Sequence, residues 1–189
     1  MLGLGGLCIA FSTTARTPLD AIVNLRKRRP FEADEVQRVI VRSATSQAER
    51  VDNREMPDIC LQYLVAVMLL DKNVSFQAAH DKPRMHEAAT LRQRAKVKLV
   101  RDEELSKLLP ARVTVVEVEL TDGSRVAERV EAVPGTRRNP MSRAEVVDKA
   151  RGLISPTLGG EASARLIETV FAIETVSDIR RLRPLLTRA

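Results

Sequence analysis

The sequence is poor in aromatic residues, cysteine and histidine, and each shortage narrows what the protein can be. Aromatic residues make up 3% of the 189 residues and tryptophan is absent, so the core must be aliphatic. Cys8 and Cys60 lie far apart and have no metal-motif spacing, which is typical of a reduced, cytoplasmic protein. His80 and His86 are separated by Lys82-Pro83 and share no helical face. We therefore expect no metal site and no cofactor.

The sequence also lacks an apolar stretch long enough to cross a membrane. The run from Ile59 to Leu70 is interrupted only by Gln62, but a spanning helix needs about 20 apolar residues. The segment Leu2–Phe11 is apolar and glycine-rich, yet no basic residue precedes it, so it is a weak secretory signal. No glycine-rich phosphate loop follows a predicted strand. These absences predict a protein without membrane contact, located in the cytoplasm.

The charge of the chain permits an acidic partner without selecting one. With 44% hydrophobic and 30% charged residues, the composition is globular, and the formal net charge is +6. The densest basic cluster, Arg26–Arg29, ends a helix that we predict over Asp20–Arg28, with Pro18 near its start. Cations at that end complement the helix dipole, whereas a nucleic-acid face would need aromatic platforms, and only Phe31 is near. The pattern favours a solvated helix end over a nucleic-acid patch.

The stretch Pro57–Asp71 is the centre of the predicted fold. A helix that is apolar all round must be covered on every side, and Pro57 and Asp58 suit its first turn. Tyr63, the only tyrosine of the chain, lies inside this run, and a buried hydroxyl needs a hydrogen-bond partner. Spacing alone favours a core tyrosine over a catalytic acid at this position.

Around this helix the residue pattern predicts an α+β fold. In the first two thirds of the chain we expect a turn at Ala33–Glu35, a strand at Glu35–Arg42, a loop at Ser43–Met56, helices at Val74–His80 and Met85–Ala95, a strand at Val97–Val100 and a helical turn at Asp102–Leu108. Towards the end we expect helices at Ser142–Ile154 and Glu161–Ile173, interrupted by Pro156 and Gly159-Gly160, and a last short helix capped by Ser177. Ser142 and Glu145 have the spacing of a capping box.

The clearest β pattern is an antiparallel hairpin formed by Arg112–Leu120 and Ser124–Val133. A three-residue loop at positions 121–123 places Val118 opposite Val126 and aligns the apolar faces, whereas a two-residue loop puts them out of phase. The longer loop also places Gly123 at the left-handed position of a bulged turn. We therefore predict the three-residue loop.

Several ordered stretches resemble the MmgE/PrpD family, a family of dehydratases and decarboxylases of tricarboxylic acids such as 2-methylcitrate and cis-aconitate. The stretches that carry the resemblance are Leu61–Asp71 (LQYLVAVMLLD), Leu120–Gly123 (LTDG), Asn139–Ser142 (NPMS), the pattern Asp20-Ala21, Leu25-Arg26, Asp34-Glu35-Val36 and Ile40-Val41, and the closing run from Leu166 to Arg180. Together they extend from about Thr17 to Leu186.

The resemblance implies a division of the chain and a partial active site. In the family, a large helical domain and a smaller α/β domain enclose the active-site cleft, and no metal or organic cofactor is required. Residues 1–16 would form an irregular head, 17–140 the small α/β domain, and 141–189 helices that pack on a helical domain absent here. Tyr63 matches a tyrosine that lines the family's cleft, and Arg16 stands where the family has a histidine. A truncated chain that is inactive alone is therefore expected.

Three hypotheses of function follow. The first is the C-terminal domain of an MmgE/PrpD-type lyase, with Tyr63 as the one catalytic residue that transfers. The second is a non-catalytic module that forms a homo-oligomer, or binds a helical partner domain, through exposed apolar stripes. The third is a basic nucleic-acid-binding domain that uses Arg26–Arg29, Arg137-Arg138 and Arg180-Arg181.

Overall fold

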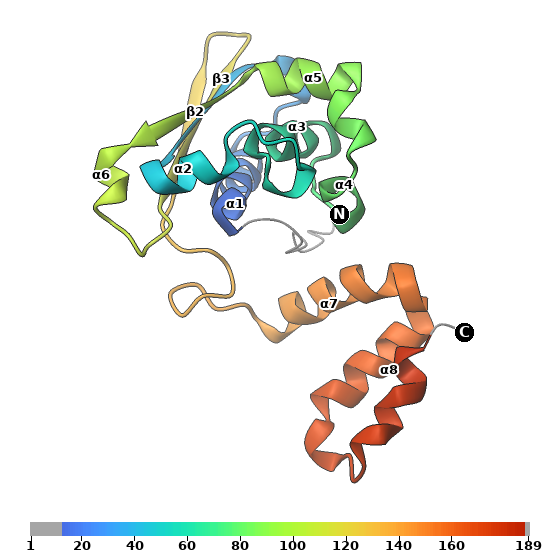
Figure 1. The fold of residues 1–189 in the computed structure, drawn as a ribbon. Coiled ribbons are helices and arrows are strands. Elements are labelled where there is room, and N and C mark those ends of the chain that lie inside the picture. The colour runs from blue at the N-terminus through green and yellow to red at the C-terminus, as the bar shows by residue number, and fades with distance from the viewer. Residues whose placement is uncertain (1–12, 188–189) are drawn as a thin grey trace. The chain divides into compact units, whose positions relative to one another are not determined.

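The computed structural model describes residues 13–187 (Figure 1) and has the predicted α+β fold. It divides into two compact units, one up to Pro140 and one from Met141 onwards, and each is described by itself below. The predictions for Leu2–Phe11 and Cys8, and most of the predicted irregular head, lie outside the described residues.

The first unit is built on a four-stranded mixed sheet with the order β2-β1-β3-β4. Its strands are β1 (Val36–Ala44), β2 (Val97–Asp102), β3 (Thr114–Leu120) and β4 (Arg125–Val130). β1 is parallel to β2 and antiparallel to β3, and β3 is antiparallel to β4. Every second residue of β3 is buried, from Thr114 to Leu120, because helices cover that face of the sheet (Figure 1).

The predicted register of the hairpin is confirmed. Val118 pairs with Val126 and Thr114 with Val130, so the loop has three residues. Gly123 has φ +82°, the left-handed conformation that the bulged turn requires. Register was predictable because a one-residue slip would turn the apolar face of β4 away from that of β3.

The central helix is confirmed as α3 (Leu61–Asp71), in which the nine residues from Leu61 to Leu69 are all buried. It contacts α1, α5 and β2. Pro57 does not begin α3. Instead it opens a separate 3-10 turn, η2 (Pro57–Ile59), and Cys60 lies between the two helices. The turn lets the chain enter the core without a proline ring inside α3.

Helix α1 (Thr13–Arg28) begins seven residues before the predicted start at Asp20 and runs through Pro18. Proline costs a helix one hydrogen bond and introduces a steric clash. Here Ala15, Leu19 and Ile22 follow helical spacing and are all fully buried, so their packing offsets that cost. Thr13–Arg16, predicted as irregular, therefore belong to α1.

The loop predicted at Ser43–Met56 is wrong. Ser43 and Ala44 extend β1, and α2 (Thr45–Val51) follows directly. Gln47, Ala48 and Val51 are buried along one side of this two-turn helix. A helix this short shows too little periodicity to be recognised in a polar sequence.

The next segment contains shorter elements than predicted. These are α4 (Phe76–Ala79), η3 (Pro83–His86), α5 (Ala88–Ala95) and α6 (Glu103–Ser106), and the lead-in turn is η1 (Ala33–Glu35). The predicted helix Met85–Ala95 is divided because η3 ends at His86. α5 buries Thr90 and Gln93, while Leu91 is exposed.

The second unit contains α7 (Arg143–Leu158), α8 (Gly160–Phe171), η4 (Ile173–Thr175) and η5 (Ile179–Leu186). The capping box of Ser142 and Glu145 is confirmed. Pro156 does not interrupt α7, because near the end of a helix it removes only one backbone bond. The interruption comes at Gly159, which has φ +79°. The last helix is capped by Asp178 rather than Ser177.

Arg26 stabilises the C-terminal end of α3. Its Nη1 and Nη2 donate hydrogen bonds to the carbonyl oxygens of Met68 (3.1 Å) and Leu69 (2.9 Å), and its guanidinium lies 5.0 Å from the Phe31 ring centroid. The last carbonyls of a helix have no partner within the helix, and a cation complements the negative end of the dipole. Arg26 thus serves the end of α3, not the end of its own helix.

We predict that Arg26→Met lowers the free energy of unfolding by about 2–3 kcal/mol, because hydrogen bonds from a charged group to two buried carbonyls are lost. Urea denaturation measures the change. The matched control is Lys27→Met, which removes the same charge from the exposed neighbouring position and should change stability by less than about 0.5 kcal/mol. Equal effects of the two substitutions would refute the role given to Arg26.

Candidate functional site

Tyr63, the predicted site residue, lies on the first turn of α3 and is fully buried. Its hydroxyl donates to the carbonyl oxygen of Ala78 at 2.5 Å and lies 3.3 Å from that of Asp81. Ala78 belongs to α4, and Asp81 lies in the chain between α4 and η3. The side chain therefore ties α3 to this segment, and its proton is directed at backbone acceptors.

The surroundings of Tyr63 keep its hydroxyl protonated. Burial raises the pKa of Tyr63 to about 12; nearby Arg84 opposes the rise, whereas Asp81 and Asp71 add to it. Arg84 is itself held by both carboxylate oxygens of Asp71, each at 2.7 Å. At neutral pH the phenol is a hydrogen-bond donor and a very weak acid.

Arg16, which the resemblance places where the family has a histidine, is almost completely buried on α1. Its Nε donates to both carboxylate oxygens of Asp20, at 3.1 and 3.2 Å. Burial raises the pKa of Asp20, and the adjacent Arg16 opposes that rise. A guanidinium stays protonated at any physiological pH, so Arg16 cannot act as the base that a histidine provides.

Two buried hydroxyl contacts meet at Thr114, one from α1 and one from within the sheet. Thr114 on β3 has its Oγ1 3.0 Å from that of Thr17 and 3.3 Å from the Oγ of Ser43 on β1. All three residues are buried, and each hydroxyl gains a partner. These contacts fix the position of the first turns of α1 above β1 and β3.

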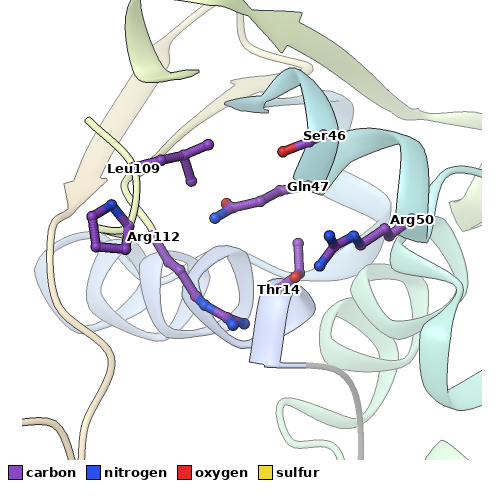
Figure 2. A pocket seen from close by; sticks show the side chains of 7 residues that line it. Thr14, Ser46, Gln47, Arg50, Leu109 and Arg112 are labelled. Carbon is purple, nitrogen blue, oxygen red and sulfur yellow. The ribbon is translucent and has the colours of Figure 1, made fainter. Parts of the chain in front are cut away.

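A cavity of about 420 Å³ lies beside the first turn of α1 (Figure 2). It is formed by three segments: α1, α2 and the chain between α6 and β3. Its lining residues are Thr14, Ser46, Gln47, Arg50, Leu109, Pro110 and Arg112. Among these described lining residues, two are arginines and none carries a carboxylate, so their charge favours an anion. Tyr63 is not among the lining residues.

Among residues 13–187, no three His, Cys, Asp or Glu side chains are grouped so that they could hold a metal ion. His80 is exposed and its Nδ1 lies 2.8 Å from the carbonyl oxygen of Phe76, while Cys60 is buried with a free thiol. Burial raises the pKa of this thiol. Over residues 13–187 no helix combines the length and apolarity needed to cross a membrane.

Sequence analysis singled out Tyr63 as a candidate site residue, but it gave no indication of the cavity. Ser46, Gln47 and Arg50 fall in the segment predicted as a loop, and Leu109–Arg112 follows a short helical turn. If this segment had been recognised as a helix, the three-residue spacing of Gln47 and Arg50 would have placed both on one face. That spacing is the one local signal of the cavity that the sequence offers. Nothing in the sequence indicated that this face meets Arg112.

Comparison with known proteins agrees with the family resemblance. The family model described as MmgE/PrpD C-terminal domain matches residues 10–175. The mouse (Mus musculus) protein named cis-aconitate decarboxylase is 26% identical over 183 residues, which cover 88% of this chain and 36% of the relative. The chain thus spans about a third of the length of that relative. Since the matched region covers most of its residues, this chain belongs to the MmgE/PrpD family and corresponds to the family's C-terminal domain.

Proposed function

We propose that this chain supplies one wall of a lyase site for a tricarboxylic acid, such as 2-methylcitrate or cis-aconitate, and does not catalyse the reaction alone. The similarity to a protein named cis-aconitate decarboxylase supports the substrate class. The chemistry would be proton transfer at a carbon beside a carboxylate, with loss of water or carbon dioxide. Such a reaction needs at least two positioned acid–base groups.

The observation that carries this proposal is the state of the Tyr63 hydroxyl. It is buried, protonated and directed at the carbonyl oxygens of Ala78 and Asp81. To protonate a substrate it would have to leave these acceptors, and Arg16 offers no base in place of a histidine. A second polypeptide segment therefore has to bring the remaining acid–base groups and open the site next to Tyr63.

The second unit provides a surface to which such a segment could bind. No residue of α7 is buried, and six large apolar side chains from α7 to η5 are exposed: Val146, Leu153, Val170, Ile173, Ile179 and Leu186. Exposed apolar stripes of this kind mark interfaces. We propose that a helical partner domain binds to these apolar side chains and covers them. The alternative is that the chain forms a homo-oligomer through them.

The basic cluster gives little support to nucleic-acid binding. Arg28 pairs with Glu128 at 2.5 Å, Arg29 pairs with Asp122 at 2.8 Å, and Arg26 is bound to α3. Three of the four cations of the cluster Arg26–Arg29 are thus engaged within the first unit. We retain a small carboxylic acid, rather than nucleic acid, as the proposed ligand class.

The assay that tests the proposal uses the purified chain with 2-methylcitrate and with cis-aconitate as substrates. We expect no turnover above the buffer rate, and the same result for Tyr63→Phe. Light scattering on the same samples reports whether the exposed stripes drive self-association. Turnover that is present in the parent chain and reduced in Tyr63→Phe would contradict the proposal, because it would mean that a complete site exists within this chain.

The protonation state of Tyr63 can be measured directly, because the chain has one tyrosine and no tryptophan. We expect the ultraviolet absorption of tyrosinate to develop near pH 12, well above the value of about 10 for an exposed tyrosine. Since the folded pKa is raised, the stabilisation from Tyr63 is complete below about pH 10 and is lost as the pH rises towards 12.

The matched variant for this measurement is Tyr63→Phe. At neutral pH its free energy of unfolding should be about 1–2 kcal/mol lower than that of the parent, because the Ala78 carbonyl loses the hydroxyl donor and keeps only the Asp81 N–H at 3.4 Å. Its stability should then fall less steeply than that of the parent between about pH 10 and 12. Formation of tyrosinate near pH 10 in a chain that keeps its native circular dichroism would refute a buried, bonded hydroxyl.

A further inference from the structure

The chain from the start of α4 to the end of η3, residues 76–86, lies beside α3 and holds both acceptors of the Tyr63 hydroxyl (Figure 1). We refer to these residues as the strap. We propose that the strap is a cover of Tyr63 that opens as a unit, and that the ion pair of Arg84 with Asp71 is the latch that keeps it closed. The proposal rests on the proposed function only where it concerns access to Tyr63, and the latch itself can be tested without turnover.

The backbone hydrogen bonds of the strap are short-range. The N–H of Ala79 donates to the carbonyl oxygen of Ser75 at 2.9 Å, and the N–H of Met85 donates to that of Lys82 at 3.2 Å. Within the described part of the chain, no backbone hydrogen bond joins the strap to α3 or to the sheet. The strap can therefore move as a unit without breaking a ladder of backbone bonds.

The latch joins the end of α3 to η3. Arg84 donates through Nη1 and Nη2 to the two carboxylate oxygens of Asp71, each at 2.7 Å, and its backbone N–H donates to Oδ1 of Asp81 at 3.0 Å. Paired hydrogen bonds of this kind are among the stronger polar contacts in proteins. The side chains of Arg84 and Asp71 are 21% and 39% exposed, so the pair can part without leaving a buried charge unpaired.

Apolar packing adds little to the hold on the strap. Met85 is its one large buried side chain, and Ala79 is buried beside it in the sequence of α4. The Phe76 ring is 52% exposed and stacks on the exposed His80, with 4.3 Å between the ring centroids. Arg94 adds one long contact, 3.4 Å from its Nη1 to the carbonyl oxygen of Met85. Segments with few buried apolar side chains and short-range hydrogen bonds open locally before the whole unit unfolds.

The strap has two opposite effects on Tyr63, and they give a test of sign. Burial is the largest cause of the raised pKa of Tyr63; Arg84 opposes the rise, whereas Asp81, Asp71 and Glu87 add to it. If the strap stays closed, loss of the Arg84 charge raises the pKa of Tyr63 further. If the strap opens, the burial is relieved and the pKa falls towards the value of about 10 for an exposed tyrosine.

Ultraviolet titration of the full chain with Arg84→Gln therefore tests the latch. We expect tyrosinate to form at a lower pH than in the parent chain, because the opened strap no longer buries Tyr63. The matched control is Lys82→Gln, which removes the same charge from an exposed position of the strap and should titrate as the parent does. Formation of tyrosinate at a higher pH than in the parent would overturn the proposal, since it would mean that the strap stays closed without the ion pair.

Amide hydrogen exchange at neutral pH measures the opening of the strap directly. We expect the strap amides to exchange about tenfold faster in Arg84→Gln than in the parent, because a charge-assisted contact is lost, while the amides of α3 keep the parent's rates. Asp71→Asn should accelerate the strap amides by a similar factor. The double variant should add no further acceleration, because both substitutions break the same contact.

Unchanged exchange of the strap amides in Arg84→Gln and Asp71→Asn would overturn the latch. So would equal acceleration in Lys82→Gln, which would indicate a general effect of charge, or equal acceleration throughout α3, which would mean that the strap opens only when the unit unfolds. These outcomes are independent of the lyase proposal. Turnover by the chain alone would refute the proposed function and leave the latch standing, whereas unchanged exchange would refute the latch alone.

Discussion

Helix α3 has no polar face that could be exposed to water, and the other elements of the first unit are packed around it. Its side chains from Leu61 to Leu69 are buried, so other elements have to cover the helix on every side. Burial also isolates its polar groups from water. The carbonyls of Met68 and Leu69 are bonded by Arg26, and the hydroxyl of Tyr63 is bonded to Ala78. Both contacts connect α3 to distant parts of the chain and so help to fix the fold.

The same constraint explains how Tyr63 serves the fold in this chain. A hydroxyl inside an apolar helix must find an acceptor, and here the acceptors are the backbone carbonyls of Ala78 and Asp81. Burial, together with the nearby Asp81 and Asp71, raises the pKa of Tyr63 to about 12. The residue is therefore a stable donor in the isolated chain. Its use as an acid would require a rearrangement of this segment, which fits a site completed by other residues.

The sequence predicted the elements whose signal is local, and missed the features that depend on distant segments. The register of β3 and β4 followed from alternation and from Gly123, because both signals lie within about twenty residues. The burial of Tyr63 followed from the apolar run around it. By contrast, α2 is too short to show a period, and α1 runs through a proline that packing overrides. The cavity joins Thr14, Gln47 and Arg112, and only the folded sheet brings these positions together.

Amide hydrogen exchange measured along the whole chain tests most directly the claim that α3 organises the first unit. We expect the amides of α3 to exchange most slowly, together with those of β1 and β3, at rates set by global unfolding of that unit. The amides of α7, which has no buried residue, should exchange much faster. Exchange of α3 as fast as that of α7 would contradict the account, because it would mean that the apolar helix opens without unfolding the elements packed around it.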